Sequence, residues 1–208
     1  MGGSLQPDYF AERINLSVLL APVGSTANIP SPGIRLAAKF LKVLEYAIVE
    51  KAKHYNWFPP VPTVMEGLIF ACDMPLLKKA CFEVLGMLNN QSVDDPKAAE
   101  TFLSNEPSGA SWRTFAYYAQ SINSGKWSLY DYGILDNKKI YGSNQPPLVP
   151  IENYRVPTAL FSGSLDALAN PTDVANLSAS IHDHVVFEKE YLLDHFSFVI
   201  AKDMTYFT

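Results

Sequence analysis

Asp166 and His195 are the two residues of this sequence whose setting could form an acid–base pair. Asp166 follows the short apolar run Thr158–Phe161, and His195 follows the next run, Val185–Tyr191. Short apolar runs bounded by turn residues are typical of strands. Functional loops of open α/β sheets follow the carboxyl ends of parallel strands, so the two side chains could hydrogen-bond. A carboxylate that fixes the tautomer of a proton-transferring histidine is part of a nucleophilic triad.

The same two residues have a plainer interpretation. Aspartate is common in turns, and a histidine can stand at the start of a helix without any chemical role. The pattern alone leaves both interpretations open.

The surrounding elements favour a parallel sheet. Between the two runs, Asn170 can cap a helix, Pro171 suits its first position, and Asp173 favours the positive end of its dipole. Strand, helix and strand in this order form a βαβ unit. Asn15–Val23 is a further apolar run that ends near a proline and predicts another buried strand. We therefore expect an α/β fold.

The middle of the chain has helical rather than strand periodicity. Its candidate helices are Gly33–Trp57, Met65–Leu88 (interrupted by Pro75) and Trp112–Asn123. The Gly-, Asn- and Pro-rich segment Tyr132–Pro150 predicts a connection back to the sheet. We expect an incomplete sheet core formed by residues 1–29 and 151–208, with residues 30–150 as a mainly helical insertion.

Composition excludes several functional classes. Sixteen basic against twenty-one acidic side chains leave a net charge of −5, and no more than two Lys or Arg are adjacent, so no nucleic-acid footprint is present. The apolar runs are shorter than the roughly 20 residues that cross a bilayer. The first ten residues show no signal peptide. Two cysteines exclude a four-thiolate zinc site, and no cofactor is indicated.

Four segments resemble the acid-lipase family in collinear order. Ser162–Val174 resembles the segment around the family's catalytic Asp, with the pattern Gly-x-x-Asp-x-Leu-Ala-x-Pro-x-Asp-Val, and Leu192–Phe198 resembles its His-x-x-Phe segment. Leu19–Pro32 resembles the stretch that leads into the lid, and Pro107–Gly133 resembles a cap segment. The match covers almost the whole chain.

This family comprises gastric and lysosomal acid lipases and related sterol esterases, with an α/β-hydrolase core and a helical cap or lid. The resemblance implies that Asp166 and His195 are catalytic and that the substrate is a lipid ester, either a triacylglycerol or a sterol ester. It also implies a secreted or lysosomal location and contact of the cap with a lipid droplet or membrane surface. Cys72 and Cys81 would form a cap disulfide by resemblance, or remain two free thiols.

The family's nucleophile elbow, Gly-His-Ser-x-Gly, is missing from these residues. The resemblance places Met1 after that elbow, so the serine and both oxyanion-hole donors would lie upstream. Gly2-Gly3-Ser4 imitates the elbow's first three positions, but Gln6 replaces its second glycine and no strand precedes it. We expect Ser4 to lie on an approach from helix to strand. We also expect this C-terminal half of a lipase to be inactive alone.

Other candidates carry less weight. His182 and His184 could share a strand face as metal ligands or lie in an exposed turn, and His54 would be a surface residue. Glycosylation sequons begin at Asn15, Asn90 and Asn176, and Asn90 is the plausible acceptor because its surroundings are polar. Six aromatic residues suit an acyl pocket or ordinary cap packing: Phe58, Trp112, Phe115, Tyr117, Tyr118 and Trp127.

Two functions from different classes therefore compete. One is a lipid ester hydrolase that uses a Ser-His-Asp acyl-transfer mechanism. This chain would supply the aspartate, the histidine and the lid. The other is a non-catalytic lipid-binding or structural remnant of a lipase. A Gly-x-Ser-x-Gly motif upstream in the same gene would favour the first. The oligomeric state stays open.

Overall fold

The computed structural model describes residues 1–51, 56–57, 74, 92–103 and 109–205. Several residues singled out above lie outside these ranges, namely His54, Phe58, Cys72, Cys81, Asn90 and all of Met65–Leu88 except Met74.

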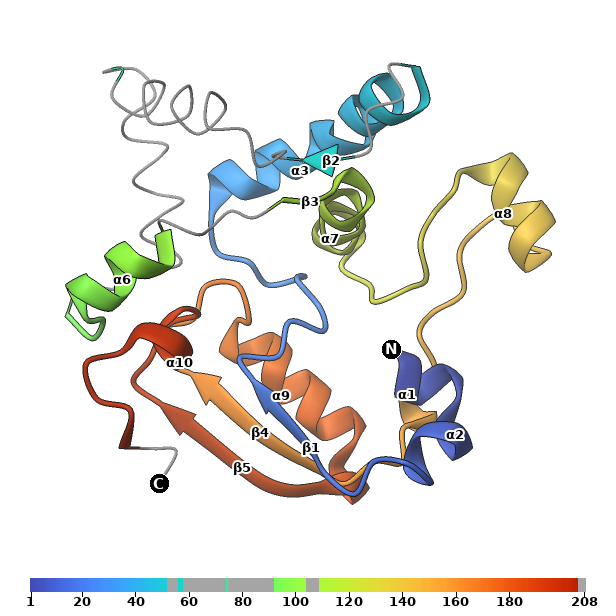
Figure 1. Cartoon of the computed structure of the whole chain (residues 1–208). Helices are drawn as coiled ribbons and strands as arrows, with labels where there is room; N and C mark the ends of the chain where they lie inside the picture. The colour runs from blue at the N-terminus through green and yellow to red at the C-terminus, as the bar shows by residue number, and fades with distance from the viewer. Residues whose placement is uncertain (52–55, 58–73, 75–91, 104–108, 206–208) are drawn as a thin grey trace.

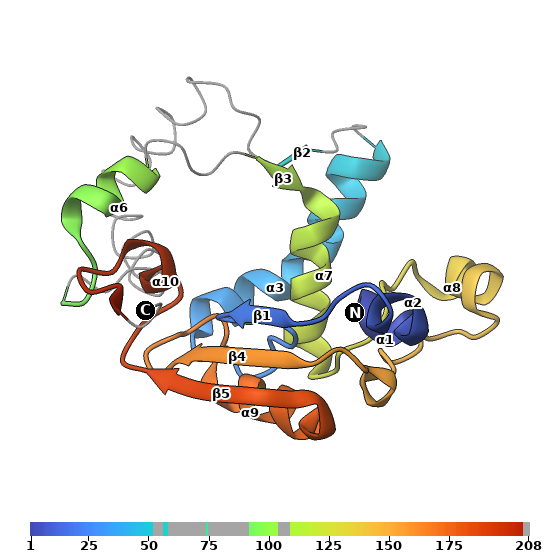
Figure 2. The same cartoon turned by 60° about the horizontal axis from the view of Figure 1, so that its bottom comes forward.

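Three parallel strands form the sheet, in the order β1-β4-β5 (Figures 1 and 2). They are β1 (Ser17–Leu20), β4 (Thr158–Gly163) and β5 (Val185–Tyr191). The expected parallel α/β arrangement is confirmed by the register, in which Leu20 pairs with Phe161 and Phe161 with Lys189.

The first strand is shorter than the expected Asn15–Val23. It ends at Leu20 because Ala21 has a φ of 47° and Pro22 has no N–H to donate to the ladder. A pair of short helices, α1 (Gly2–Leu5) and α2 (Pro7–Ala11), precedes it.

Helix α9 (Pro171–Ser180) connects β4 to β5 and packs against β4 (Figure 2). Asn170 caps it as expected, since its side-chain oxygen accepts a hydrogen bond from Thr172 N at 2.9 Å. A hydrophobic core cluster is formed by Ala21, Ala169, Val174, Leu193, Phe198 and Ala201. The short helix α10 (Ser197–Ile200) contributes Phe198 to this cluster.

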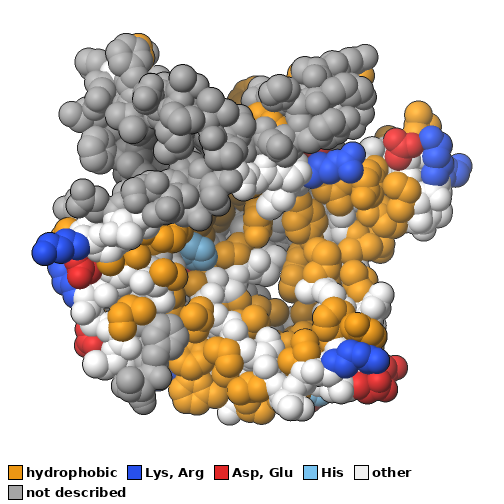
Figure 3. All heavy atoms as spheres, in the orientation of Figure 1, with side chains coloured by type: hydrophobic (Ala, Val, Ile, Leu, Met, Phe, Trp, Pro, Cys, Tyr) orange, Lys and Arg blue, Asp and Glu red, His pale blue; other side chains and the backbone are white. Residues whose placement is uncertain are grey.

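The other sheet face retains exposed apolar side chains. Val18 is 53% and Phe187 45% exposed. Hydrophobic side chains are visible over the sheet and over the neighbouring helices (Figure 3).

In the described part of residues 30–150 the helices are α3 (Pro32–Glu45), α6 (Pro96–Leu103), α7 (Trp112–Ser124) and α8 (Ile134–Tyr141). Helices α3 and α7 pack together, and Asn123 Nδ2 donates to the carbonyl of Ala38 at 2.8 Å. No helix in the described ranges combines the length and apolar character needed to cross a membrane.

The expected helix Gly33–Trp57 is helical as far as Lys51 but is wrong at Asn56–Trp57. Helix α3 ends at Glu45, a π-helical turn covers Tyr46–Lys51, and Asn56–Trp57 forms strand β2. Strand β2 pairs antiparallel with β3 (Ala110–Ser111). A partner more than fifty residues away therefore overrides the helical periodicity.

The expected connection Tyr132–Pro150 contains helix α8. Its glycines stand at the helix ends, since Gly133 is the N-cap residue and Gly142 is the C-cap residue with a φ of 74°. A glycine in the left-handed conformation ends a helix without strain. A 3₁₀ turn, Ile151–Asn153, then leads to β4.

Candidate active site

Asp166 and His195 lie on the loops that follow the carboxyl ends of β4 and β5. Asp166 Oδ2 is 2.9 Å from His195 Nδ1, which confirms the contact expected from the strand order. The Asp166 side chain is fully buried, whereas the His195 side chain is 21% exposed. The pair thus combines a water-excluded carboxylate with an imidazole that solvent or a reactant can reach.

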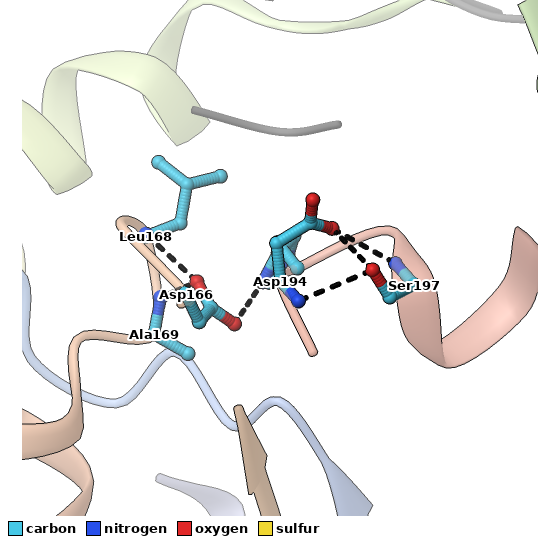
Figure 4. A network of polar contacts seen from close by, with 6 residues as sticks. Asp166, Leu168, Ala169, Asp194 and Ser197 are labelled. Carbon is cyan, nitrogen blue, oxygen red and sulfur yellow. Dashed lines mark hydrogen bonds and ion pairs between the residues drawn. The ribbon is translucent and has the colours of Figure 1, made fainter. Parts of the chain in front are cut away.

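The other oxygen of Asp166 is held by the backbone. Its Oδ1 accepts hydrogen bonds from Leu168 N and Ala169 N, both at 2.8 Å (Figure 4). These two donors orient the carboxylate so that Oδ2 faces His195. An ionised Asp166 accepts the Nδ1 proton, which leaves the Nε2 lone pair of His195 able to take up a proton.

Backbone contacts join the two loops. Ser164 N donates to Tyr191 O at 2.8 Å, and Leu165 N donates to Leu193 O at 3.1 Å. Gly163 permits this approach, because a Cβ atom at that position would lie 2.3 Å from Leu193 O. The distance between Asp166 and His195 therefore depends on the absence of a side chain at the end of β4.

A buried polar cluster, which the sequence analysis missed, adjoins the histidine. Asp94, Asp194 and Ser197 are each at most 2% exposed. Burial, and then the charge of Asp94, raise the pKa of Asp194 above its usual value. Asp194 could have been noticed as the neighbour of His195, but nothing in the local sequence indicates that Asp94 is close.

Ser4 does not reach the acid–base pair. It lies in α1, beside the amino ends of the strands and away from the loops that follow their carboxyl ends (Figures 1 and 2). The residue is 1% exposed, and its Oγ has no hydrogen-bond partner among the residues that the structure describes. A buried hydroxyl in a four-residue helix is the opposite of an exposed nucleophile elbow.

The two neighbouring histidines lie in an exposed turn. His182–His184 is a 3₁₀ turn, and His182 Nε2 lies 3.0 Å from Asp183 Oδ1. The described ranges contain no group of three side chains arranged to hold a metal ion.

The aromatic residues have separate environments. The rings of His195 and Phe196 are 5.9 Å apart, and Phe196 lies 4.9 Å from Phe102 of α6. Of the aromatic residues considered for an acyl pocket, Trp127 lines a cleft of ≈ 780 Å³ beside α9, to which neither Asp166 nor His195 contributes. Tyr117 instead donates to Ser128 O at 2.7 Å, as in ordinary packing.

The curated relatives of this chain are lipases. Human lipase member J is 28% identical over 202 residues, which cover 93% of this chain and 53% of the relative. Human lipase member K is 27% identical over 198 residues, 93% of this chain and 48% of the relative. Human gastric triacylglycerol lipase is 30% identical over 105 residues, 50% of this chain and 26% of the relative.

The similarities to lipase members J and K extend over nearly the whole chain and agree with the resemblance inferred from its motifs. The chain spans about half the length of lipase members J and K. No protein-family model matches it. A three-stranded parallel sheet with helices is consistent with part of an α/β-hydrolase fold.

Proposed function

We propose that this chain, whose curated relatives are lipases, supplies the general base and its orienting acid to a lipid ester hydrolase. The observation that carries the proposal is the 2.9 Å contact between Asp166 Oδ2 and His195 Nδ1. Among the described residues no hydrogen bond to His195 Nε2 is present, so this nitrogen is available for a proton from a reactant.

In the proposed reaction, His195 Nε2 accepts the proton of a serine hydroxyl while the serine oxygen attacks the ester carbonyl. Asp166 stabilises the resulting imidazolium. His195 then gives the proton to the departing alcohol, and an acyl-enzyme remains. Water, activated by the same histidine, releases the fatty acid. The serine and the oxyanion donors come from a preceding part of the parent protein, consistent with relatives of about twice this length.

The proposed domain organisation is a hydrolase core formed by residues 1–29 and 151–208, with residues 30–150 as the lid. One exposed surface supports contact between the lid and a lipid aggregate. On α3, Leu36, Phe40 and Val43 are 57%, 59% and 69% exposed. Side chains of this kind can enter a lipid surface at low cost.

The name of the gastric relative, a triacylglycerol lipase, favours triacylglycerol over sterol ester as the substrate. We propose a secreted or lysosomal location by the same resemblance. A Cys72–Cys81 disulfide and a glycan on Asn90 would be compatible with that compartment.

The alternative is a non-catalytic lipid-binding remnant. It is favoured by one observation, namely that the sequence contains no Gly-x-Ser-x-Gly motif. Sequencing the transcript upstream of Met1 separates the two proposals, because only the hydrolase requires the motif there.

The direct test is triacylglycerol hydrolysis by the full-length protein. We expect His195→Ala to abolish turnover, and Asp166→Asn to reduce it by up to about ten-thousand-fold, as for a misoriented triad histidine. His182→Ala, in the exposed turn, is the matched control and should retain the parent rate. A His195→Ala enzyme with parental turnover would refute the proposal.

A further inference from the structure

Asp94, Ser197 and Asp194 form a continuous polar chain next to His195. Ser197 Oγ lies 2.6 Å from Asp94 Oδ1 and 2.9 Å from Asp194 Oδ1. It also accepts a hydrogen bond from Asp194 N at 3.1 Å, while Ser197 N donates to Asp194 Oδ1 at 3.0 Å. The second carboxylate oxygen of Asp194 points away from Ser197 (Figure 4) and has no hydrogen-bond partner within the described part of the chain.

The number of available protons limits the charge of the network formed by Asp94, Ser197 and Asp194. The Ser197 hydroxyl has one hydrogen, which can lie between Oγ and only one of the two carboxyl groups. If both aspartates were ionised, the other short contact would bring two electron-rich oxygens together without a proton in a buried site. Both contacts are hydrogen bonds only when one carboxyl group is protonated.

The proton belongs on Asp194. Burial raises the pKa of Asp194, and the negative charge of Asp94 raises it further, although the Ser197 and Phe196 amides act in the opposite direction. In this arrangement the Asp194 carboxyl group donates a hydrogen bond to Ser197 Oγ, and the Ser197 hydroxyl group donates one to the Asp94 carboxylate.

The charged groups nearby have other contacts. Asp166 and His195 are bound to each other. Asp95 Oδ1 accepts from Lys97 N, and Lys202 Nζ donates to Ser92 O at an exposed position. Asp203, after α10, is bound to Thr205.

The polar chain joins two parts of the molecule. Asp94 precedes α6 in the insertion, whereas Asp194 and Ser197 flank His195. Two backbone hydrogen bonds also join these parts: Asp95 N donates to Ile200 O at 2.8 Å, and Lys202 N donates to Val93 O at 2.9 Å.

We propose that Asp194 is a protonated positioning residue, and that Asp194, Ser197 and Asp94 form a proton-sharing latch that holds residues 92–103 against the turn carrying His195. The importance of His195 rests on the proposed function, but the latch itself rests only on these contacts.

The latch has a defined pH dependence. The folded protein retains a proton on Asp194 at pH values where the unfolded chain has released it. The stabilisation is therefore complete below the usual aspartate pKa and is lost as the pH rises through the raised pKa of Asp194. Above it, two adjacent buried carboxylates repel each other and weaken the contact between the insertion and the turn.

Asp194→Asn tests this in the 208-residue chain, because its side chain carries no charge at any pH while its Oδ1 can still accept from Ser197 N. We expect the same Tm as the parent near pH 4, and a Tm that is higher than the parent's by roughly 2–4 °C near pH 8. The control is Asp183→Asn, whose carboxylate is 79% exposed and should leave the pH profile of the parent unchanged.

Two NMR measurements complete the test without any substrate, so failure of the proposed hydrolase would not affect them. The Asp194 side-chain carboxyl carbon of the parent should titrate above the usual aspartate range. The proton on His195 Nδ1 should exchange faster above that transition in the parent but not in Asp194→Asn. An ordinary Asp194 titration, or parallel Tm profiles for parent and Asp194→Asn, would overturn the proposal.

Discussion

A methyl group added at Gly163 should separate the acid from the base. In Gly163→Ala the new Cβ would lie 2.3 Å from Leu193 O and 2.9 Å from Leu193 C. Ordinary contacts begin at 3.4 Å, so the β4 end and the following turn must move apart by about 1 Å. Because these atoms belong to the backbone, no side-chain rotation can relieve the clash.

The consequence can be estimated from the contacts nearby. A shift of about 1 Å would lengthen the bond from Leu165 N to Leu193 O and the contact between Asp166 and His195 beyond hydrogen-bonding range. Overpacking costs about 1–3 kcal/mol, and one weakened hydrogen bond adds about 1 kcal/mol. We expect a loss of about 2–4 kcal/mol, which corresponds to a Tm lower by roughly 4–16 °C in a chain of this size.

Thermal unfolding by circular dichroism measures this loss, and the NMR signal of the His195 Nδ1 proton reports the contact itself. Gly33→Ala is the matched control, since its nearest neighbour, Ser31 Oγ, would lie 3.7 Å from the new Cβ. Its stability should change by less than about 1 kcal/mol. A Gly163→Ala chain with an unchanged Tm and an intact Nδ1 signal would refute the reasoning.

Three further changes have defined outcomes. Asn170→Ala removes the cap of α9 and should cost about 1 kcal/mol in urea unfolding, with an unchanged m-value. Asp166→Asn should remove the Nδ1 proton signal of His195 while the fold persists, because the asparagine oxygen can still accept from the two backbone amides; retention of that signal would contradict the assigned contact. Hydrolysis of a short-chain nitrophenyl ester by the 208-residue chain should be indistinguishable from that of Ser4→Ala, since Ser4 lies beside the opposite ends of the strands; turnover abolished by Ser4→Ala would show otherwise.

Much of the sheet core was predictable because its signals are local. The run Val185–Tyr191 became a strand with those bounds, and Asn170 and Pro171 start a helix where their backbone preferences place it. The contact between Asp166 and His195 also followed from the sequence, since adjacent parallel strands bring their carboxyl-end loops to one edge of the sheet.

The insertion was less predictable because its local signals compete with distant contacts. Periodicity continued α3 to Trp57, but pairing with Ala110–Ser111 made Asn56–Trp57 a strand. Glycines that predicted a loop stand instead at the two ends of α8. The Met65–Leu88 prediction lies outside the described residues apart from Met74.

The sequence by itself determined the order of the strands and helices, the residue types available as acid and base, and the side of the sheet on which they emerge. Tertiary structure alone decided how closely the two loops approach and what surrounds them. Leu193 O comes against Gly163 only when β5 pairs with β4, and Asp94 meets Ser197 across 103 positions of chain. Backbone preferences act over a few residues, whereas burial and shared protons depend on which distant surfaces are brought into contact.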